Sequence, residues 1–265
     1  FSLTGKMPPD SDNTLDTDLE LSNINLSKAR LSGEWEPRAG VVSGKIHLSV
    51  PKDNRLVWQG QLNAKKLALG VPENRRTVEN ASVKLQTQPD YRSNFDVKLN
   101  GVVLGQTKFK QVLGVIDVSK ESIQLSHGRI FPEHGQIDLN GNYYPLTQKY
   151  DFRFAGKKLV SEDLLPEYIE GPLDLEGNLF RGKHAKHPLR GVSGSMQIKF
   201  ADGSLRQLGF FTTLLTLLNP QSLATAQKQG LNFSYLGGNF IINEGVITTA
   251  DMELKGPQMN LLAAG

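Results

Sequence analysis

The sequence predicts a mainly β fold, a long antiparallel sheet that is interrupted near the C-terminus by an apolar helical segment. Two observations carry this prediction. Many short runs alternate apolar and polar residues, whereas the run from 204 to 229 follows a helical period. Strict alternation is typical of half-buried antiparallel strands, because successive side chains point to opposite faces of the sheet.

The alternation is clear between residues 137 and 143. Ile137 and Leu139 share one parity, and Asp138 and Asn140 share the other. The same pattern recurs at 46–50, 173–179 and 196–200. Turn-forming clusters separate these runs at intervals of roughly 8 to 15 residues, as in all-β chains.

A short repeat, apolar-x-Gly-x-apolar, runs through these segments. Only about three copies are expected by chance. Copies occur around Gly33, Gly44, Gly60, Gly101, Gly114, Gly141, Gly177, Gly194 and Gly238. A glycine at an apolar strand position permits a bend, so that repetition curls the sheet around its apolar face. The alternative is that these glycines belong to turns between strands.

The helical segment begins with a capping-box spacing, Ser204 followed by Gln207. Asn219 and Pro220 end a first helix and can start a second, which stops before Gly230. The apolar positions of the first helix are Leu205, Leu208, Phe210, Phe211, Leu214, Leu215, Leu217 and Leu218. A helix this apolar either fills a core or faces an apolar partner.

Three segments organise the chain. Residues 1–181 read as the repeating strands, 182–190 as a basic loop or linker, and 191–265 as a C-terminal module of strand, helices at 204–229 and further strands. Within the first segment, 1–15 is expected to be an irregular lead-in and 161–170 a short helix.

Composition excludes several classes of protein. The chain has 265 residues, a net charge of +3 and no cysteine, so it holds no disulfide framework and no thiol chemistry. No stretch reaches the roughly 18 apolar residues that span a bilayer. Because the chain begins at Phe1 and carries no signal peptide, we expect an excerpt from a longer protein, with any anchor outside it.

No catalytic constellation is present, and the sequence predicts neither an enzyme nor a cofactor. His127, Glu133 and His134 lie near one another in sequence, but isolated loop histidines are usually solvated, so no metal site is predicted. We expect the scattered basic pairs to be solvated residues in turns rather than parts of a nucleic-acid surface. These pairs are Lys65–Lys66, Arg75–Arg76 and Lys157–Lys158.

Apolar surface is the remaining feature. Either a second sheet covers the apolar face, giving a sandwich or a closed barrel, or the face lines a groove that holds a ligand. A long apolar groove suits an acyl chain, because each buried methylene contributes about 0.8 kcal/mol without any specific polar group.

The run from Gly194 onward resembles the C-terminal region of AsmA-like proteins, the bacterial envelope family that includes TamB and YhdP relatives. The matching pieces occur in order: the strand Met196–Phe200, the leucine-rich helix that ends at Asn219, and the segments Leu236–Phe240, Ile242–Val246 and Leu254–Pro257. The resemblance covers about the last quarter of the chain. The earlier strands resemble the family only in that they alternate apolar and polar residues and contain regularly placed glycines.

The resemblance implies a U-shaped sheet with an apolar interior, anchored in the inner membrane and crossing the periplasm. It implies passive transfer of phospholipid or another acyl-chain lipid between membranes in support of outer-membrane integrity, without catalytic residues. The groove or gate candidates are Phe210, Phe211, Leu214, Leu215, Leu218, Phe233, Tyr235, Phe240, Ile242, Leu139 and Leu175. The second hypothesis is a scaffold for outer-membrane protein or envelope assembly, with a packed interior and a protein partner at its sheet edges.

Overall fold

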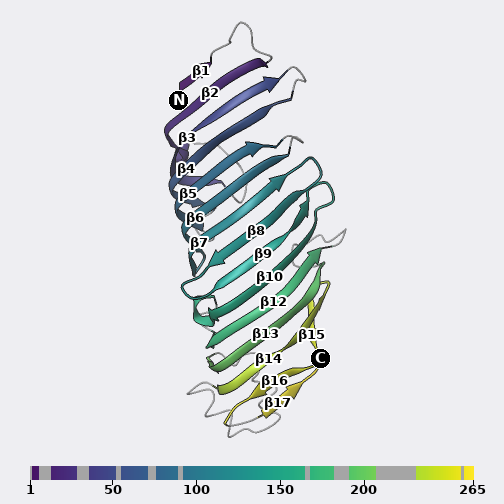
Figure 1. Cartoon of the computed structure of the whole chain (residues 1–265). Coiled ribbons are helices and arrows are strands. Elements are labelled where there is room, and N and C mark those ends of the chain that lie inside the picture. The colour runs from purple at the N-terminus through teal and green to yellow at the C-terminus, as the bar shows by residue number, and fades with distance from the viewer. Residues whose placement is uncertain are drawn as a thin grey trace. The chain divides into compact units, whose positions relative to one another are not determined.

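The structure is a computed structural model of the whole chain (Figure 1). It describes residues 2–5, 13–28, 36–51, 55–70, 76–88, 92–164, 168–181, 191–206, 231–257 and 260–265. All described strands belong to one antiparallel sheet that is not closed into a barrel, so the mainly β prediction is confirmed and the sandwich alternative is wrong.

The chain divides into two compact units. The first comprises Phe1–Ile130 and Tyr144–Leu146, and the second comprises Phe131–Tyr143 and Thr147–Gly265.

In the first unit each strand pairs with the next along the chain, giving a meander from β1 to β7. Strand β8 follows β7, and the Ser126 hydroxyl donates to the Val115 carbonyl across them, with 3.1 Å between the oxygens. The elements are β1 (Ser2–Gly5), β2 (Asn13–Asn25), the 3-10 helix η1 (Leu26–Lys28), β3 (Pro37–Pro51), β4 (Val57–Leu69), β5 (Arg76–Thr87), β6 (Ser93–Leu104), β7 (Thr107–Val118) and β8 (Ile123–Phe131).

In the second unit the meander runs through β9, β10, β12, β13 and β14. Both β15 and β16 pair with β14, β17 pairs with β16, and the short β11 pairs with the end of β13. The elements are β9 (Gln136–Tyr144), β10 (Lys149–Val160), η3 (Ser161–Asp163), β11 (Ile169–Glu170), β12 (Pro172–Arg181), β13 (Val192–Leu205), β14 (Leu231–Asn243), β15 (Val246–Thr249), β16 (Met252–Lys255) and β17 (Asn260–Ala263).

A bend crosses β4 to β7 in the first unit. In each of these strands two core residues stand three positions apart, with two residues between them that point the other way. The core pairs are Ala64 and Leu67, Val78 and Ala81, Leu99 and Val102, and Phe109 and Val112. These pairs are aligned from strand to strand, so that Ala64, Ala81, Leu99 and Val112 form one row and the others a second. The extra outward residue in each strand turns the sheet toward its apolar side, as a β-bulge does.

Two residues in this bend have positive φ. Lys66 has φ 52° and Gly101 has φ 60°. The row of bulges continues into β3, where the pairing with β4 shifts register between Pro37 and Val41, around Gly40 at φ 133°.

A comparable bend crosses the second unit. Phe233 and Leu236 both lie in the core of this unit, three positions apart on β14. The neighbouring β13 carries Asp202 at φ 47°, and β10 carries Lys158 at φ 54° beside a register shift. Tyr235, a groove candidate together with Phe233, lies instead on the outward side because of this bend, where it lines a hollow with Lys199 and Glu253.

Three local predictions are corrected. Ser204 and Leu205 do not start a helix, because they end β13, where Leu205 pairs with Leu231 and is 4% exposed. Residues 207–229 of the predicted helical segment lie outside the described residues. No α-helix occurs in the described part of the chain. The lead-in contains a strand, β1, which pairs with β2.

The helix predicted for 161–170 is also wrong. Ser161–Asp163 form a single 3-10 turn, and Ile169–Glu170 form a strand. The fully buried Ser161 hydroxyl lies 3.0 Å from each of the Ile169 and Gly171 carbonyl oxygens and holds the turn against the strand that follows. No helix among the described residues has the length and apolar character needed to cross a membrane.

Candidate functional site

The apolar residues of the first unit form continuous rows across its strands. Because the strands are paired without interruption, the rows cross from β3 to β7 and present one apolar surface. The first row is Ile46, Gly60, Leu85, Phe95 and Ile116, and the second is Gly44, Leu62, Val83, Val97 and Gly114. We call this surface the apolar face.

The opposite side of the same strands is polar and carries its own hydrogen bonds. The Gln61 amide donates to Ser82 Oγ at 3.1 Å, and Gln111 donates to Asn100 Oδ1 at 2.9 Å. Along β4 and β6 exposed polar residues alternate with half-buried apolar ones. The two faces therefore differ in chemistry along β4 and β6, whereas Leu113 and Val115 of β7 lie on the outward side opposite Lys98 and Asp96.

Eight of the nine repeat glycines named above are described, and all eight lie within strands. The turn interpretation is therefore wrong for Gly44, Gly60, Gly101, Gly114, Gly141, Gly177, Gly194 and Gly238. Gly33 lies outside the described residues.

Several of these glycines stand opposite large apolar residues. Gly60 lies between Ile46 and Leu85. Gly177 lies between Phe154 and Met196. Large side chains therefore cover the gaps that glycines leave, and the neighbouring backbones approach closely.

The apolar face of the second unit has a packed end. Its core consists of Leu159, Ile169, Leu173, Phe200, Leu205, Leu231, Phe233, Leu236, Met252 and Leu254. Leu159 and Leu254 are each 1% exposed. The rings of Phe200 and Phe233 meet edge to face, with centroids 6.3 Å apart. This end is filled by the protein's own side chains.

The other end of the same face is more open. Phe152, Leu179, Met196 and Ile242 are half-buried, and none of them belongs to the core cluster. Their strands are paired, so the apolar face of the second unit passes from a packed core to a partly accessible surface.

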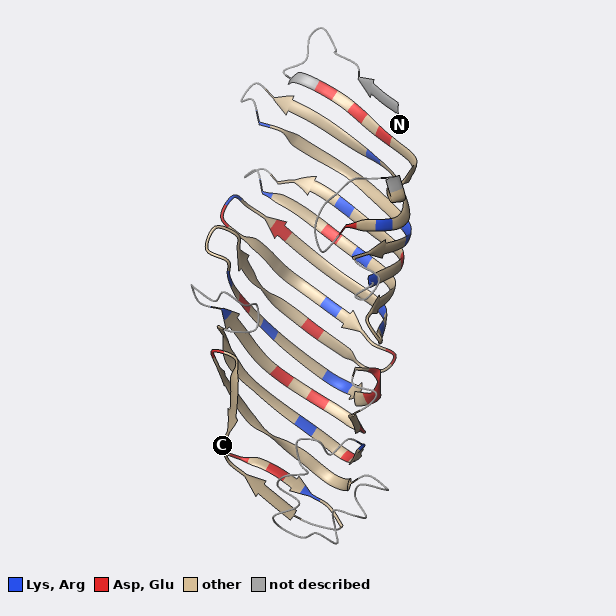
Figure 2. Cartoon of the chain, turned by 180° about the vertical axis from the view of Figure 1, so that it is seen from behind, with Lys and Arg blue, Asp and Glu red and all other residues tan. Residues whose placement is uncertain are grey.

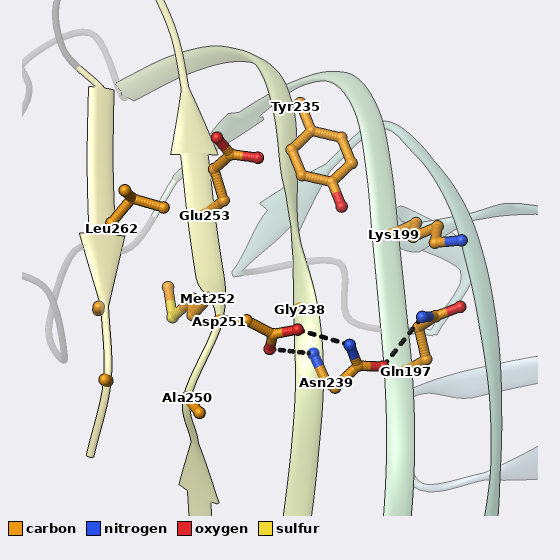
Figure 3. Close-up of a pocket in the computed structure, with 12 residues that line it drawn as sticks. Gln197, Lys199, Tyr235, Gly238, Asn239, Ala250, Asp251, Met252, Glu253 and Leu262 are labelled. Atoms are coloured by element: carbon orange, nitrogen blue, oxygen red, sulfur yellow. Dashed lines mark hydrogen bonds between the residues drawn. The ribbon is translucent and has the colours of Figure 1, made fainter.

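Hollows lie on the polar side of both units. One of about 530 Å³ is bounded by β13, β14, β16 and β17, and Gln197, Lys199, Tyr235 and Glu253 are among its lining residues (Figure 3). Another of about 720 Å³ lies over β3 to β6 of the first unit, among Gln59, Gln61 and Lys84. Amides and charges line these hollows together with apolar residues such as Met252 and Leu262 in the first and Leu85 in the second.

Asp251 holds the junction between β15 and β16 beside the smaller hollow (Figure 3). Its carboxylate accepts the Asn239 backbone N–H at 2.8 Å and the Asn239 side-chain amide at 2.6 Å. Gln197 in turn donates to Asn239 Oδ1 at 2.9 Å. The backbone N–H bond from Asn239, followed by the side-chain bond, lowers the pKa of Asp251 below its ordinary value.

The residues predicted from sequence to line a groove occupy different places. Phe233 is 3% exposed and lies in the core of the second unit, with Phe240 and Leu175 packed against it from half-buried positions. Leu139 and Ile242 are half-buried on the apolar face of the second unit. Phe210, Phe211, Leu214, Leu215 and Leu218 lie outside the described residues.

Tyr235 is separate from this group. Its side chain borders the polar hollow, and the Lys255 ammonium lies 5.6 Å from the centre of its ring. The bend in β14 therefore removes Tyr235 from the apolar face.

Chemistry-bearing side chains are dispersed. Within the described ranges, no three or more His, Asp or Glu side chains gather so that they could hold a metal ion. His134 Nδ1 lies 3.2 Å from Asp163 Oδ2, and His47 lies between Asp16 and Asp18, so each histidine has only local carboxylate neighbours among these residues.

Comparisons with known proteins gave no match. No family model matches the chain, and no curated protein or solved structure does. The resemblance to AsmA-like proteins therefore stays a prediction from the sequence.

Proposed function

We propose that the chain binds phospholipid, or another acyl-chain lipid, along its apolar face and passes it on without catalysis. In this proposal the chain is part of a longer U-shaped bridge in the bacterial periplasm, anchored in the inner membrane by a segment outside this sequence. The bridge supports outer-membrane integrity.

The observation that carries the proposal is the continuous apolar face of the first unit. Its rows cross five paired strands, β3 to β7. All described strands lie in one sheet, so no second described sheet covers this face. Uncovered apolar surface of this extent is typical of binding sites.

The chemistry is that of a passive surface. Acyl tails lie along the apolar rows, where each methylene removed from water contributes about 0.8 kcal/mol. Head groups stay at the wet strand ends. Because the tails need no specific polar partner, they can slide from strand to strand, and direction comes from other proteins.

A scaffold role is the second candidate. The packed core of the second unit favours it, since Leu159 and Leu254 leave no room for a ligand there. In that role the exposed sheet edges pair with an envelope protein.

Site-specific photocrosslinking to a labelled phospholipid tests the proposal. A photoreactive amino acid is placed at an apolar position of each unit, Val97 in the first and Leu139 in the second. In separate variants it is placed at the neighbouring polar position, Asp96 or Asn140. We expect lipid adducts at the apolar positions only. A scaffold with a packed interior gives none at any of the four.

A further inference from the structure

The bend of the first unit gathers lysines that are scattered in the sequence. Lys65 and Lys66 are the outward pair of β4, and Lys110 belongs to the outward pair of β7. Lys108 lies two residues further along β7 on the same outward side. All four side chains are exposed. We call this surface the basic bend.

Register places these lysines across neighbouring strands. Lys65 pairs with Asn80 on β5, Asn80 pairs with Asn100 on β6, and Asn100 pairs with Gln111 on β7, beside Lys110. Three strand spacings cover about 14 Å. Figure 2 shows basic segments together where the strands of this unit curl over.

Lysines outnumber acidic residues on the described part of this surface. Glu79 is the one acidic residue in the described outward pairs, which also contain Lys65, Lys66 and Lys110. Away from the bend, the acidic residues Asp16, Asp18 and Glu20 of β2 face Lys45 and His47 of β3. Among the described residues, the outward side of the bend therefore brings four lysines together with one glutamate.

An exposed aliphatic residue lies within the basic bend. Val41 pairs directly with Lys65, so the two side chains share a side of the sheet, and Val41 is 38% exposed. The nearby aromatic residue, Phe109, instead packs in the core on the other side. Lysines with an aliphatic neighbour suit an anionic bilayer surface, whereas single-stranded nucleic acid requires outward aromatic rings.

We propose that the basic bend is a docking surface for an anionic lipid bilayer. Its lysines lie on the convex side of the sheet, so they can approach a flat surface together, and Val41 can enter the headgroup layer. Because this side is opposite the apolar face, the inference does not depend on lipid binding along that face.

Vesicle cosedimentation of the whole chain tests the proposal. Vesicles of phosphatidylcholine with about 30 mol% phosphatidylglycerol are compared with pure phosphatidylcholine vesicles at low salt, of about 50 mM. The variant carries Lys65→Gln, Lys66→Gln, Lys108→Gln and Lys110→Gln. A matched control carries the same change at Lys45, Lys84, Lys98 and Lys120, which lie in the same unit away from the bend.

The chain is expected to bind only the anionic vesicles, and the bend variant is expected to lose at least about tenfold in partitioning while the control loses less than about threefold. The two double variants, Lys65→Gln with Lys66→Gln and Lys108→Gln with Lys110→Gln, should each lose an intermediate amount. Circular dichroism confirms that each variant is folded.

Three outcomes overturn the proposal. The first is equal loss in the bend variant and the control, which reduces the effect to net charge. The second is equal binding to neutral and anionic vesicles, or none to either. The third is tighter binding to a single-stranded oligonucleotide than to anionic vesicles. Photocrosslinking at Val97 should be unchanged in the bend variant, which separates this surface from the apolar face.

Discussion

Glycines on the apolar face occupy places where a neighbouring backbone fills the volume of a side chain. A Cβ at Gly60 would collide with the Lys45 carbonyl oxygen and lie 2.8 Å from Ile46 Cα. Gly114 occupies the same place in the repeat but has room, since a Cβ there would lie 3.3 Å from Leu125 Cδ1 and 4.0 Å from the nearest backbone atom. The repeat therefore contains both obligatory and replaceable glycines.

Gly60→Ala should lower the free energy of unfolding by about 2–3 kcal/mol, because strand backbones must separate to admit the methyl group. Gly114→Ala should stay within about 1 kcal/mol of wild type, since alanine also restricts the unfolded chain. Urea denaturation measures both values. Equal decreases in the free energy of unfolding for the two variants would show that the close approach of the β3 backbone to Gly60 does not affect stability.

Asp251 gives a second prediction at the scale of one residue, through pH. Its pKa is lowered in the folded chain, so its stabilisation is complete above the ordinary value of 3.8 and is lost as pH falls through the folded pKa. Asp251→Asn should lower Tm at neutral pH by no more than about 3 °C, because the carboxylate is open to solvent. The difference from wild type should shrink as pH falls through the folded pKa, which lies below 3.8.

Thermal melts of wild type and Asp251→Asn across this pH range measure the effect. Glu176→Gln, an exposed change on β12, serves as the control and should show no such pH dependence. A Tm difference that persists unchanged at acid pH would show that Asp251 acts through something other than its charge.

At the scale of the element, period-two alternation predicts the strands but not their bends. Ala64 and Leu67 face the same core although they stand three positions apart, and so do Phe109 and Val112. This spacing is also that of a helix, so a single strand cannot distinguish a bulge from a turn of helix. Only the alignment of the same step in four paired strands identifies it as a bend.

The helix prediction fails at Ser204 for a related reason. Ser204 and Gln207 match the capping-box spacing locally. Pairing of Leu205 with Leu231 and Ile169, both distant in sequence, continues the strand instead and buries Leu205 in the core. Long-range pairing of this kind cannot be derived from local spacing. The apolar face itself could be predicted, because parity alone defines it.

Lys66 tests the bend directly, because its φ of 52° is costly for any residue except glycine. Lys66→Gly should leave the free energy of unfolding unchanged or raise it by up to about 1 kcal/mol, whereas Lys66→Val should lower it by about 1–2 kcal/mol. At the neighbouring Lys65, whose φ is not positive, the order should reverse: Gly costs about 0.5–1 kcal/mol and Val is tolerated.

Urea denaturation of the four variants gives this comparison, and both positions lose the same charge. If glycine lowers the free energy of unfolding more than valine does at both positions, Lys66 does not have the positive φ of a bulge residue in solution.

At the scale of the molecule, all described strands lie in one sheet, and neither face of these strands is covered by a second described layer. Apolar residues on such a sheet need a partner, and the proposed partner is lipid.

The two units contribute differently to this account. In the first unit the core cluster is small, with Val78, Ala81 and Val102 as its buried members, and the apolar rows are half-buried except at Leu85 and Gly114. In the second unit a larger core fills one end of the face. Lipid contact is therefore expected along the first unit and at the open end of the second.

The most direct test of the central claim is the ratio of lipid photocrosslinking at adjacent positions on opposite faces. With a photoreactive residue at Val97, and separately at Asp96, a labelled phospholipid should give at least about tenfold more adduct at Val97, because only that side removes acyl chains from water. The same ratio is expected for Leu139 over Asn140. Equal yields on the two faces, or no adduct at Val97 and Leu139 in a folded chain, would contradict lipid binding along the apolar face.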